Sequence, residues 1–149
     1  MSLPYENATS GSRALDDTQK ILTRFGCSRF GTMTDNAAGE ILVQFTHRGR
    51  DVSIKASFKG YASAWLKEHP YSARMKKSRT DYERAAMVQA QISTYSILRD
   101  WIKGQVTAIE VGLLSFEGAF LGQIMLPTGV TILDYMQSET RLLAAPEAA

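Results

Sequence analysis

Residues 41–57 of this chain read ILVQFTHRGRDVSIKAS, and this stretch decides the fold. An apolar residue occupies every second position on each side of Arg48 and Gly49, as in two β-strands with one buried face. A two-residue turn at Arg48-Gly49 places all six of these residues on the same face, whereas a slip by one residue would move half of them to the other face. The predicted cross-strand pairs are Phe45 with Val52, Val43 with Ile54, and Ile41 with Ala56.

The residues of the predicted turn are unusual for a hairpin this short. Type I′ turns suit two-residue hairpins, need a positive φ at both central positions and favour Asn or Asp before Gly. Arg48 departs from that preference. The strand pairing is therefore better specified by the sequence than the type of turn.

The segments around the hairpin complete an α+β pattern, a three-stranded antiparallel meander packed against a long C-terminal helix and shorter helices. Residues 28–34 carry Phe30 and Met33 and precede the turn-forming DNAAG, which predicts the first strand. The apolar face of the meander must be covered by helices. The predicted helices are residues 12–25, capped by Ser12 and ended by Gly26; residues 59–69, ended by Pro70; about 30 residues from Thr80, with an apolar stripe from Ala85 through Val88 and Tyr95 to Ile109; and two short segments capped by Ser115 and Thr131.

Length and composition favour one folded domain. The chain has 149 residues, of which 44% are hydrophobic and 21% charged, and its formal net charge is +2. A chain of this size can bury about 70% of the surface that its unfolded state exposes. We expect a flexible arm over residues 1–11, a single α+β domain over residues 12–143 and a frayed tail over residues 144–149.

Several classes of protein are disfavoured by what the sequence lacks. Cys27 is the single cysteine, so no internal disulfide or CxxC zinc motif is available, and the two histidines lie twenty-two positions apart. No apolar run approaches the roughly 20 residues that span a bilayer, and the N-terminus lacks the apolar core of a signal peptide. We expect a cytoplasmic protein with no membrane partner, metal or cofactor.

The positive charge is concentrated in the middle of the chain. Residues 1–43 carry a net charge of −1, residues 44–79 carry +7 and residues 80–149 carry −4. The basic residues of the middle segment gather at the hairpin tip and in a connector between the second and third helices, where two tyrosines accompany them. The candidate nucleic-acid-binding residues are Arg48, Arg50, Lys55, Lys59, Tyr71, Arg74, Lys76, Lys77 and Arg79.

Such a distribution favours a partner that carries phosphates. Lys and Arg side chains neutralise the backbone of DNA or RNA, and aromatic rings can stack on unpaired bases. The hypothesis requires folding to bring the hairpin tip and the connector together into one continuous surface. The competing interpretation is that both stretches are ordinary solvated surface, kept soluble by their charge.

The order helix, three strands, helix over residues 12–69 resembles the double-stranded-RNA-binding domain. In that family the third strand leads through a loop that bears lysines into an Ala-rich helix, and the stretch from Lys55 to Gly60 followed by YASAWL is similar. The family's tight run of lysines at the start of that helix is absent here. The resemblance implies recognition of an A-form duplex by its shape.

A second resemblance concerns the stretch from Leu98 to Gln105, LRDWIKGQ, and its continuation to Phe116-Glu117. It looks like a segment of uncharacterised small proteins encoded by phages and prophages. This resemblance implies an alternative function, a protein-interaction module that inhibits or adapts a host protein through its helical surface. Met87, Ile97 and Trp101 lie off the main apolar stripe of the long helix, so a homodimer through that helix is a further hypothesis.

Patterns typical of catalysis are missing. The sequence has no Gly-rich phosphate loop, no GxSxG motif and no HxE followed by CxxC. Its closely spaced carboxylates, such as Asp81 and Glu83, are explained equally well by helix capping. We therefore assign no catalytic residue and favour a non-enzymatic role, while a small hydrolase or nuclease without a recognisable motif stays open.

Overall fold

The three strands form one antiparallel sheet in the order β1-β2-β3, as the sequence predicts. The structure is a computed structural model that describes residues 3–139 and 144–145. About half of these residues are helical, and the α+β class is confirmed. The elements are α1 (Gly11–Phe25), β1 (Arg29–Asp35), β2 (Glu40–His47), β3 (Arg50–Ser57), α2 (Phe58–Glu68), α3 (Arg79–Glu110), α4 (Phe116–Phe120), the 3-10 helix η1 (Leu121–Gln123) and α5 (Ile132–Ser138).

The predicted register of the hairpin is confirmed at each of its three pairs. Arg48 and Gly49 have φ angles of 50° and 79°, so both central residues adopt the left-handed conformation of a type I′ turn. Arg48 is therefore held in a backbone conformation that a β-hairpin normally assigns to Asn, Asp or Gly. The inward-facing residues of β2 and β3 become the buried face of the sheet: Ile41, Val43, Phe45, Val52 and Ile54 are each at most 7% exposed.

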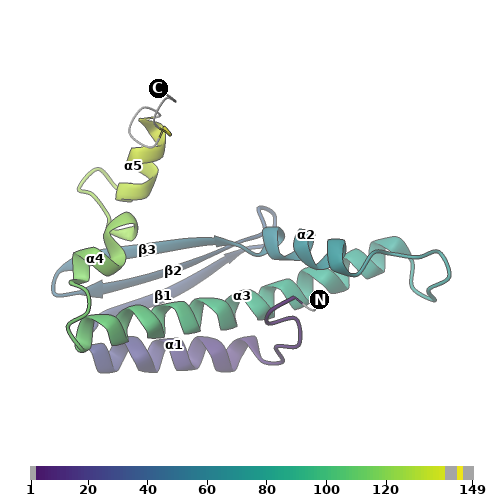
Figure 1. Cartoon of the computed structure of the whole chain (residues 1–149), viewed down its shortest axis with the longest axis horizontal. Helices are drawn as coiled ribbons and strands as arrows, with labels where there is room; N and C mark the ends of the chain where they lie inside the picture. Colours follow the sequence, from purple (N-terminus) through teal and green to yellow (C-terminus); the bar gives the residue numbers. More distant parts are fainter. Residues whose placement is uncertain (1–2, 140–143, 146–149) are drawn as a thin grey trace.

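Two helices cover that face of the sheet, and a third extends beyond it. Figure 1 shows α1 and α3 running side by side along the sheet, while α2 continues in the direction of β3 and lies on the first half of α3. The chain after α3 turns back towards the hairpin at α4, and α5 projects away from the other elements (Figure 1). The molecule is elongated as a result, with its length set by α3.

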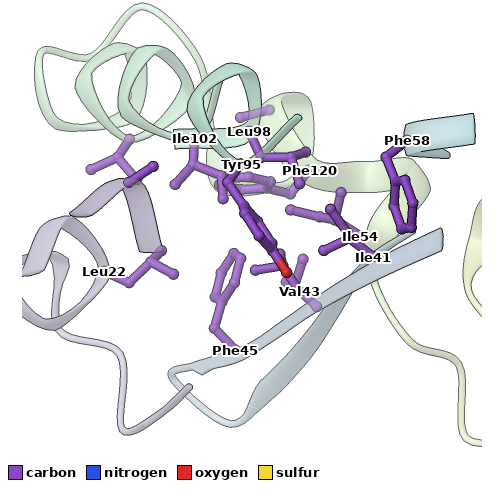
Figure 2. Close-up of a cluster of buried hydrophobic side chains, with 14 of the residues drawn as sticks. Leu22, Ile41, Val43, Phe45, Ile54, Phe58, Tyr95, Leu98, Ile102 and Phe120 are labelled. Carbon is purple, nitrogen blue, oxygen red and sulfur yellow. The ribbon is translucent and has the colours of Figure 1, made fainter. Parts of the chain in front are cut away.

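The core lies between the sheet, α1 and α3. Figure 2 shows Leu22 of α1, Tyr95 and Ile102 of α3 and Phe120 of α4 pointing towards the inward residues of β2 and β3. Tyr95 keeps its hydroxyl at the edge of this cluster, where it forms a 2.6 Å hydrogen bond with the hydroxyl of Thr34 in β1. Apolar burial here provides the main stabilisation, at roughly 25 cal/mol per Å² of apolar surface.

The helix starts differ from the predicted ones by one or two residues. Ser10, rather than Ser12, caps α1 and accepts a hydrogen bond from the Arg13 amide. Ser78, rather than Thr80, caps α3 and accepts from the Asp81 amide. The two caps work in the same way. In each, a serine hydroxyl accepts a hydrogen bond from the amide three residues later, which the helix itself leaves without an acceptor. The predicted caps Ser115 and Thr131 are confirmed for α4 and α5.

The predicted apolar stripe of α3 is right in the second half of the helix and wrong in the first. Tyr95, Ile102 and Val106 are buried, but Val88 is 58% exposed, and the small residues Ala86 and Ala90 are buried instead. The reason is that the first half packs against α2 and the N-terminal segment rather than against the sheet. Close helix packing selects small side chains there, which a hydrophobic period does not detect.

Residues 3–10, the part of the predicted flexible arm that the structure describes, lie against α3. The Tyr5 hydroxyl donates to Asp100, and the Tyr5 carbonyl accepts a hydrogen bond from the Ser93 hydroxyl at 2.7 Å. The Gln89 side chain donates to the Ala8 carbonyl at 3.0 Å. Composition alone did not anticipate these contacts. Gly11 at the start of α1 continues the close approach, because a Cβ there would lie 2.9 Å from the Tyr95 ring. Most of the predicted frayed tail, residues 146–149, lies outside the described residues.

Within residues 3–139, no helix combines the length and the apolar character needed to cross a bilayer.

Candidate functional site

The two basic stretches lie at opposite ends of the molecule, so the predicted continuous surface is wrong, and the hypothesis of a phosphate grip shared between the hairpin tip and the connector fails with it. Arg50 forms a salt bridge with Glu117 of α4, which follows the C-terminal end of α3. The connector, residues 69–79, leads into the N-terminal end of the same helix, of which Arg79 is the first residue. With 32 residues, α3 is about 48 Å long at 1.5 Å per residue. Figure 1 shows the β2–β3 turn and the connector at the two extremes of the long axis.

The connector is held in place by aromatic residues at its base. The Tyr71 hydroxyl donates to the Lys77 carbonyl at 2.8 Å, and the Tyr82 hydroxyl donates to the His69 carbonyl at 2.6 Å. The Tyr71 and Tyr82 rings lie 5.5 Å apart, and the Arg79 guanidinium lies 5.5 Å above the Tyr71 ring. Tyr71 therefore closes the loop by contacts within the chain, whereas the sequence suggested a ring free to stack on bases.

The cations of the connector are exposed and have no ion-pair partner within the part of the chain that the structure describes. Asp81, the acid nearest in sequence to Lys76, Lys77 and Arg79, pairs with Arg84 at 3.3 Å instead. Four unpaired charges on a short loop produce a concentrated positive potential in solvent. These connector cations are Arg74, Lys76, Lys77 and Arg79.

Lys55 and Lys59 belong to neither end. Lys55 is exposed on the face of the sheet away from α1 and α3, and Lys59 is exposed in the first turn of α2. β3 passes directly into α2 at Ser57 and Phe58. The lysine-bearing loop of the double-stranded-RNA-binding domain has no counterpart at this junction, and that resemblance stays a prediction.

The hairpin end is built around His47, the last residue of β2. Its ring stacks on Phe25 at 4.1 Å between centroids, with an interplanar angle of 5°, and on Phe116 at 5.1 Å with an angle of 22°. Burial and the nearby Arg48 guanidinium lower the pKa of His47, while a hydrogen bond with the Phe25 backbone acts in the opposite direction. The ring thus packs as a neutral aromatic that joins three elements.

Beside this stack is a pocket of about 650 Å³. It lies between the end of α1, the β2–β3 turn, the end of α3 and the start of α4. The salt bridge of Arg50 with Glu117 forms one wall. A hydrogen bond from the Glu117 backbone amide, and then the Arg50 guanidinium, lower the pKa of the Glu117 carboxyl. The residues that line the pocket are Arg24, Phe25, His47, Arg48, Arg50, Ile109, Glu110, Phe116 and Glu117.

Arg24 is the one cation of this pocket that sequence reasoning missed. Gly26 ends α1, β1 begins at Arg29, and Arg29 pairs with Thr46 near the end of β2. This short path brings the last turn of α1 beside the hairpin tip. The predicted strand pairing could therefore have identified Arg24, because it requires the end of α1 to lie close to the end of β2.

Metal-ligating groups and the single cysteine were the remaining candidates for a reactive site. Among residues 3–139, no cluster of three or more metal-ligating side chains occurs. Burial raises the pKa of Cys27 to about 11, so its thiol stays protonated and is a poor nucleophile at neutral pH.

Comparison with models of known protein families, with curated proteins and with solved structures gives no match. Function is therefore inferred from the residues and their geometry.

Proposed function

We propose that this protein binds nucleic acid without catalysing a reaction, and that it does so through the connector rather than through a surface that includes the hairpin tip. The observation that carries this proposal is the group of four exposed connector cations with no ion-pair partner among the described residues. Unpaired Lys and Arg side chains release counterions from a phosphate backbone, which is the main source of binding that ignores sequence.

The shape of the connector supports phosphate contact over base recognition. The loop projects from the end of the molecule (Figure 1), and its tyrosines are engaged within the chain. A projecting cationic loop can follow a backbone of either DNA or RNA, but it presents no helix or strand for insertion into a groove. The proposed binding is therefore electrostatic, tolerant of sequence and steeply dependent on salt.

The test is fluorescence anisotropy of the whole chain with labelled single-stranded and duplex oligonucleotides over a series of salt concentrations. The double variant Lys76→Glu/Lys77→Glu should weaken binding by about tenfold or more at low salt, since two contacts become repulsive. The wild-type slope of log K against log salt should not be steeper than about −3.6, the value for four phosphate contacts on a duplex.

The matched control is Arg24→Glu/Arg48→Glu, which changes the net charge equally at the other end of the molecule. It should retain affinity within about twofold, because the distance between the two ends exceeds the Debye length of about 10 Å at 0.1 M salt. Equal losses in the two variants would show that net charge alone causes the binding. That result, or no binding of any oligonucleotide at low salt, would overturn the proposal.

A second candidate function is a protein-interaction module, and a separate observation favours it. Of the twelve large apolar residues that are exposed among the described ones, seven lie after α3. A concentration of exposed apolar side chains in one part of the chain is typical of a protein interface. This apolar C-terminal surface consists of Val111, Leu113, Leu114, Leu121, Val130, Leu133 and Tyr135.

A further inference from the structure

The pocket at the hairpin end has the volume of a small-molecule site. Its volume of about 650 Å³ falls within the range of about 300–1,000 Å³ that ligand pockets occupy. Three arginines line it from two separate elements, Arg24 from the last turn of α1 and Arg48 and Arg50 from the hairpin. Their convergence at one cavity depends on the tertiary fold and is not a property of a single charged loop.

The backbone of Arg48 provides a second, independent observation. Its φ of 50° is a left-handed conformation that side chains with a Cβ rarely adopt, and the type I′ turn favours Asn or Asp at this position. Asn, Asp or Gly at position 48 would relieve this strain. The chain instead places a long cationic side chain there, at the rim of the pocket. A strained residue beside a cavity points to a role in that cavity.

The charges around the pocket leave two guanidinium groups available. Arg50 is engaged by Glu117, and Glu110 also lines the cavity. Arg24 and Arg48 form no ion pair within the described part of the chain. The lining residues therefore include three arginines and two glutamates, and the two arginines without an ion-pair partner carry the excess positive charge.

We propose that this pocket binds a small molecule that carries a phosphate group. Guanidinium groups pair with phosphate oxygens through two parallel hydrogen bonds, which makes arginine the preferred side chain for this anion. Arg24 and Arg48 would hold the phosphate, while Phe25, Phe116 and Ile109 offer apolar contact to the remainder of the ligand. The proposal is independent of nucleic-acid binding by the connector, which lies at the other end of α3.

The test is isothermal titration calorimetry of the whole chain with AMP, phenyl phosphate and adenosine as probes. AMP or phenyl phosphate should bind, and adenosine, which lacks the phosphate, should bind at least about tenfold more weakly. The decisive variant is Arg48→Asn, which should weaken binding of the phosphate probe by about tenfold or more. Asn suits the turn better than Arg, so the Tm of the Arg48→Asn variant should equal or exceed that of the wild type. A loss of binding in this variant is therefore not explained by a loss of folding.

Two further variants complete the design. Glu117→Gln releases Arg50 and removes one carboxylate, so it should strengthen phosphate binding. Lys76→Gln/Lys77→Gln at the connector should leave it unchanged within about twofold. The proposal is overturned if no phosphate probe binds at millimolar concentration, if adenosine binds as tightly as AMP, if Arg48→Asn binds as the wild type does, or if the connector variant causes the loss.

Discussion

At the scale of single residues, Phe120 is the contact that fixes the chain after α3 to the core. Its side chain is 0% exposed. It lies edge-on to Phe45 at 5.4 Å and to Trp101 at 5.7 Å, and its ring is 5.5 Å from that of Phe116. Such edge-to-face contacts add about 0.5–1.5 kcal/mol to the gain from burial. Phe120 thus connects α4 to both the sheet and α3.

Replacement of this side chain tests that assignment. Phe120→Ala should lower the free energy of unfolding by about 3–5 kcal/mol, measured by urea denaturation, because it leaves a cavity between three aromatic rings. The neighbouring Leu121 is 52% exposed, and Leu121→Ala should change stability by no more than about 0.5 kcal/mol. Similar losses for the two variants would contradict the assignment of Phe120 to the core.

At the scale of elements, His47 joins the end of α1, the end of β2 and α4 in one aromatic stack. Its folded-state pKa lies below the ordinary value of 6.5. The unfolded chain therefore binds a proton more readily than the folded one, and protonation favours unfolding. The free energy of unfolding should therefore fall as the pH drops below about 7. It should stop depending on His47 once the pH lies below the folded-state pKa of this residue.

Urea denaturation between pH 7.5 and 5.5 measures this dependence. The contribution of one proton is at most about 1.4 kcal/mol per pH unit. His47→Phe keeps an aromatic ring between Phe25 and Phe116 but removes the titrating group, so this part of the slope should disappear. His69→Gln, the control at the other end of the molecule, should retain it. Acidic groups with lowered pKa values, such as Asp100 and Glu117, act below this range.

The elements that sequence reasoning predicted well are those whose burial is one-sided and regular. β2 and β3 bury every second residue, so period and turn length together specified the register. The first half of α3 was predicted poorly because its neighbours are α2 and the N-terminal segment, and the residues buried there are alanines and hydroxyl-bearing side chains such as Ser93. Hydrophobic periodicity does not register packing by small or hydrogen-bonded residues.

At the scale of the whole molecule, the length of α3 determines which charges act together. The sequence predicted a helix of about the observed length, but the relation of the hairpin to that helix depends on the course of α2. Because α2 continues the direction of β3, the connector is carried away from the hairpin tip before the chain returns (Figure 1). Local charge therefore predicted both basic stretches, and only the tertiary arrangement showed that they are separate.

The apolar C-terminal surface also bears on the hypothesis of a homodimer: we predict that a second copy contacts the residues after α3 instead of the long helix itself. Along α3 only Val88 and Trp101 are large exposed apolar residues, and Trp101 already contacts Phe120. The mass from light scattering at micromolar concentration should exceed that of the monomer. Leu113→Ser/Leu121→Ser, at sites 76% and 52% exposed, should restore the monomer mass without loss of folding. The control Val88→Ser, at a site 58% exposed on α3, should leave the mass unchanged. If Val88→Ser alone yields the monomer, the dimer forms through the long helix and this prediction is wrong.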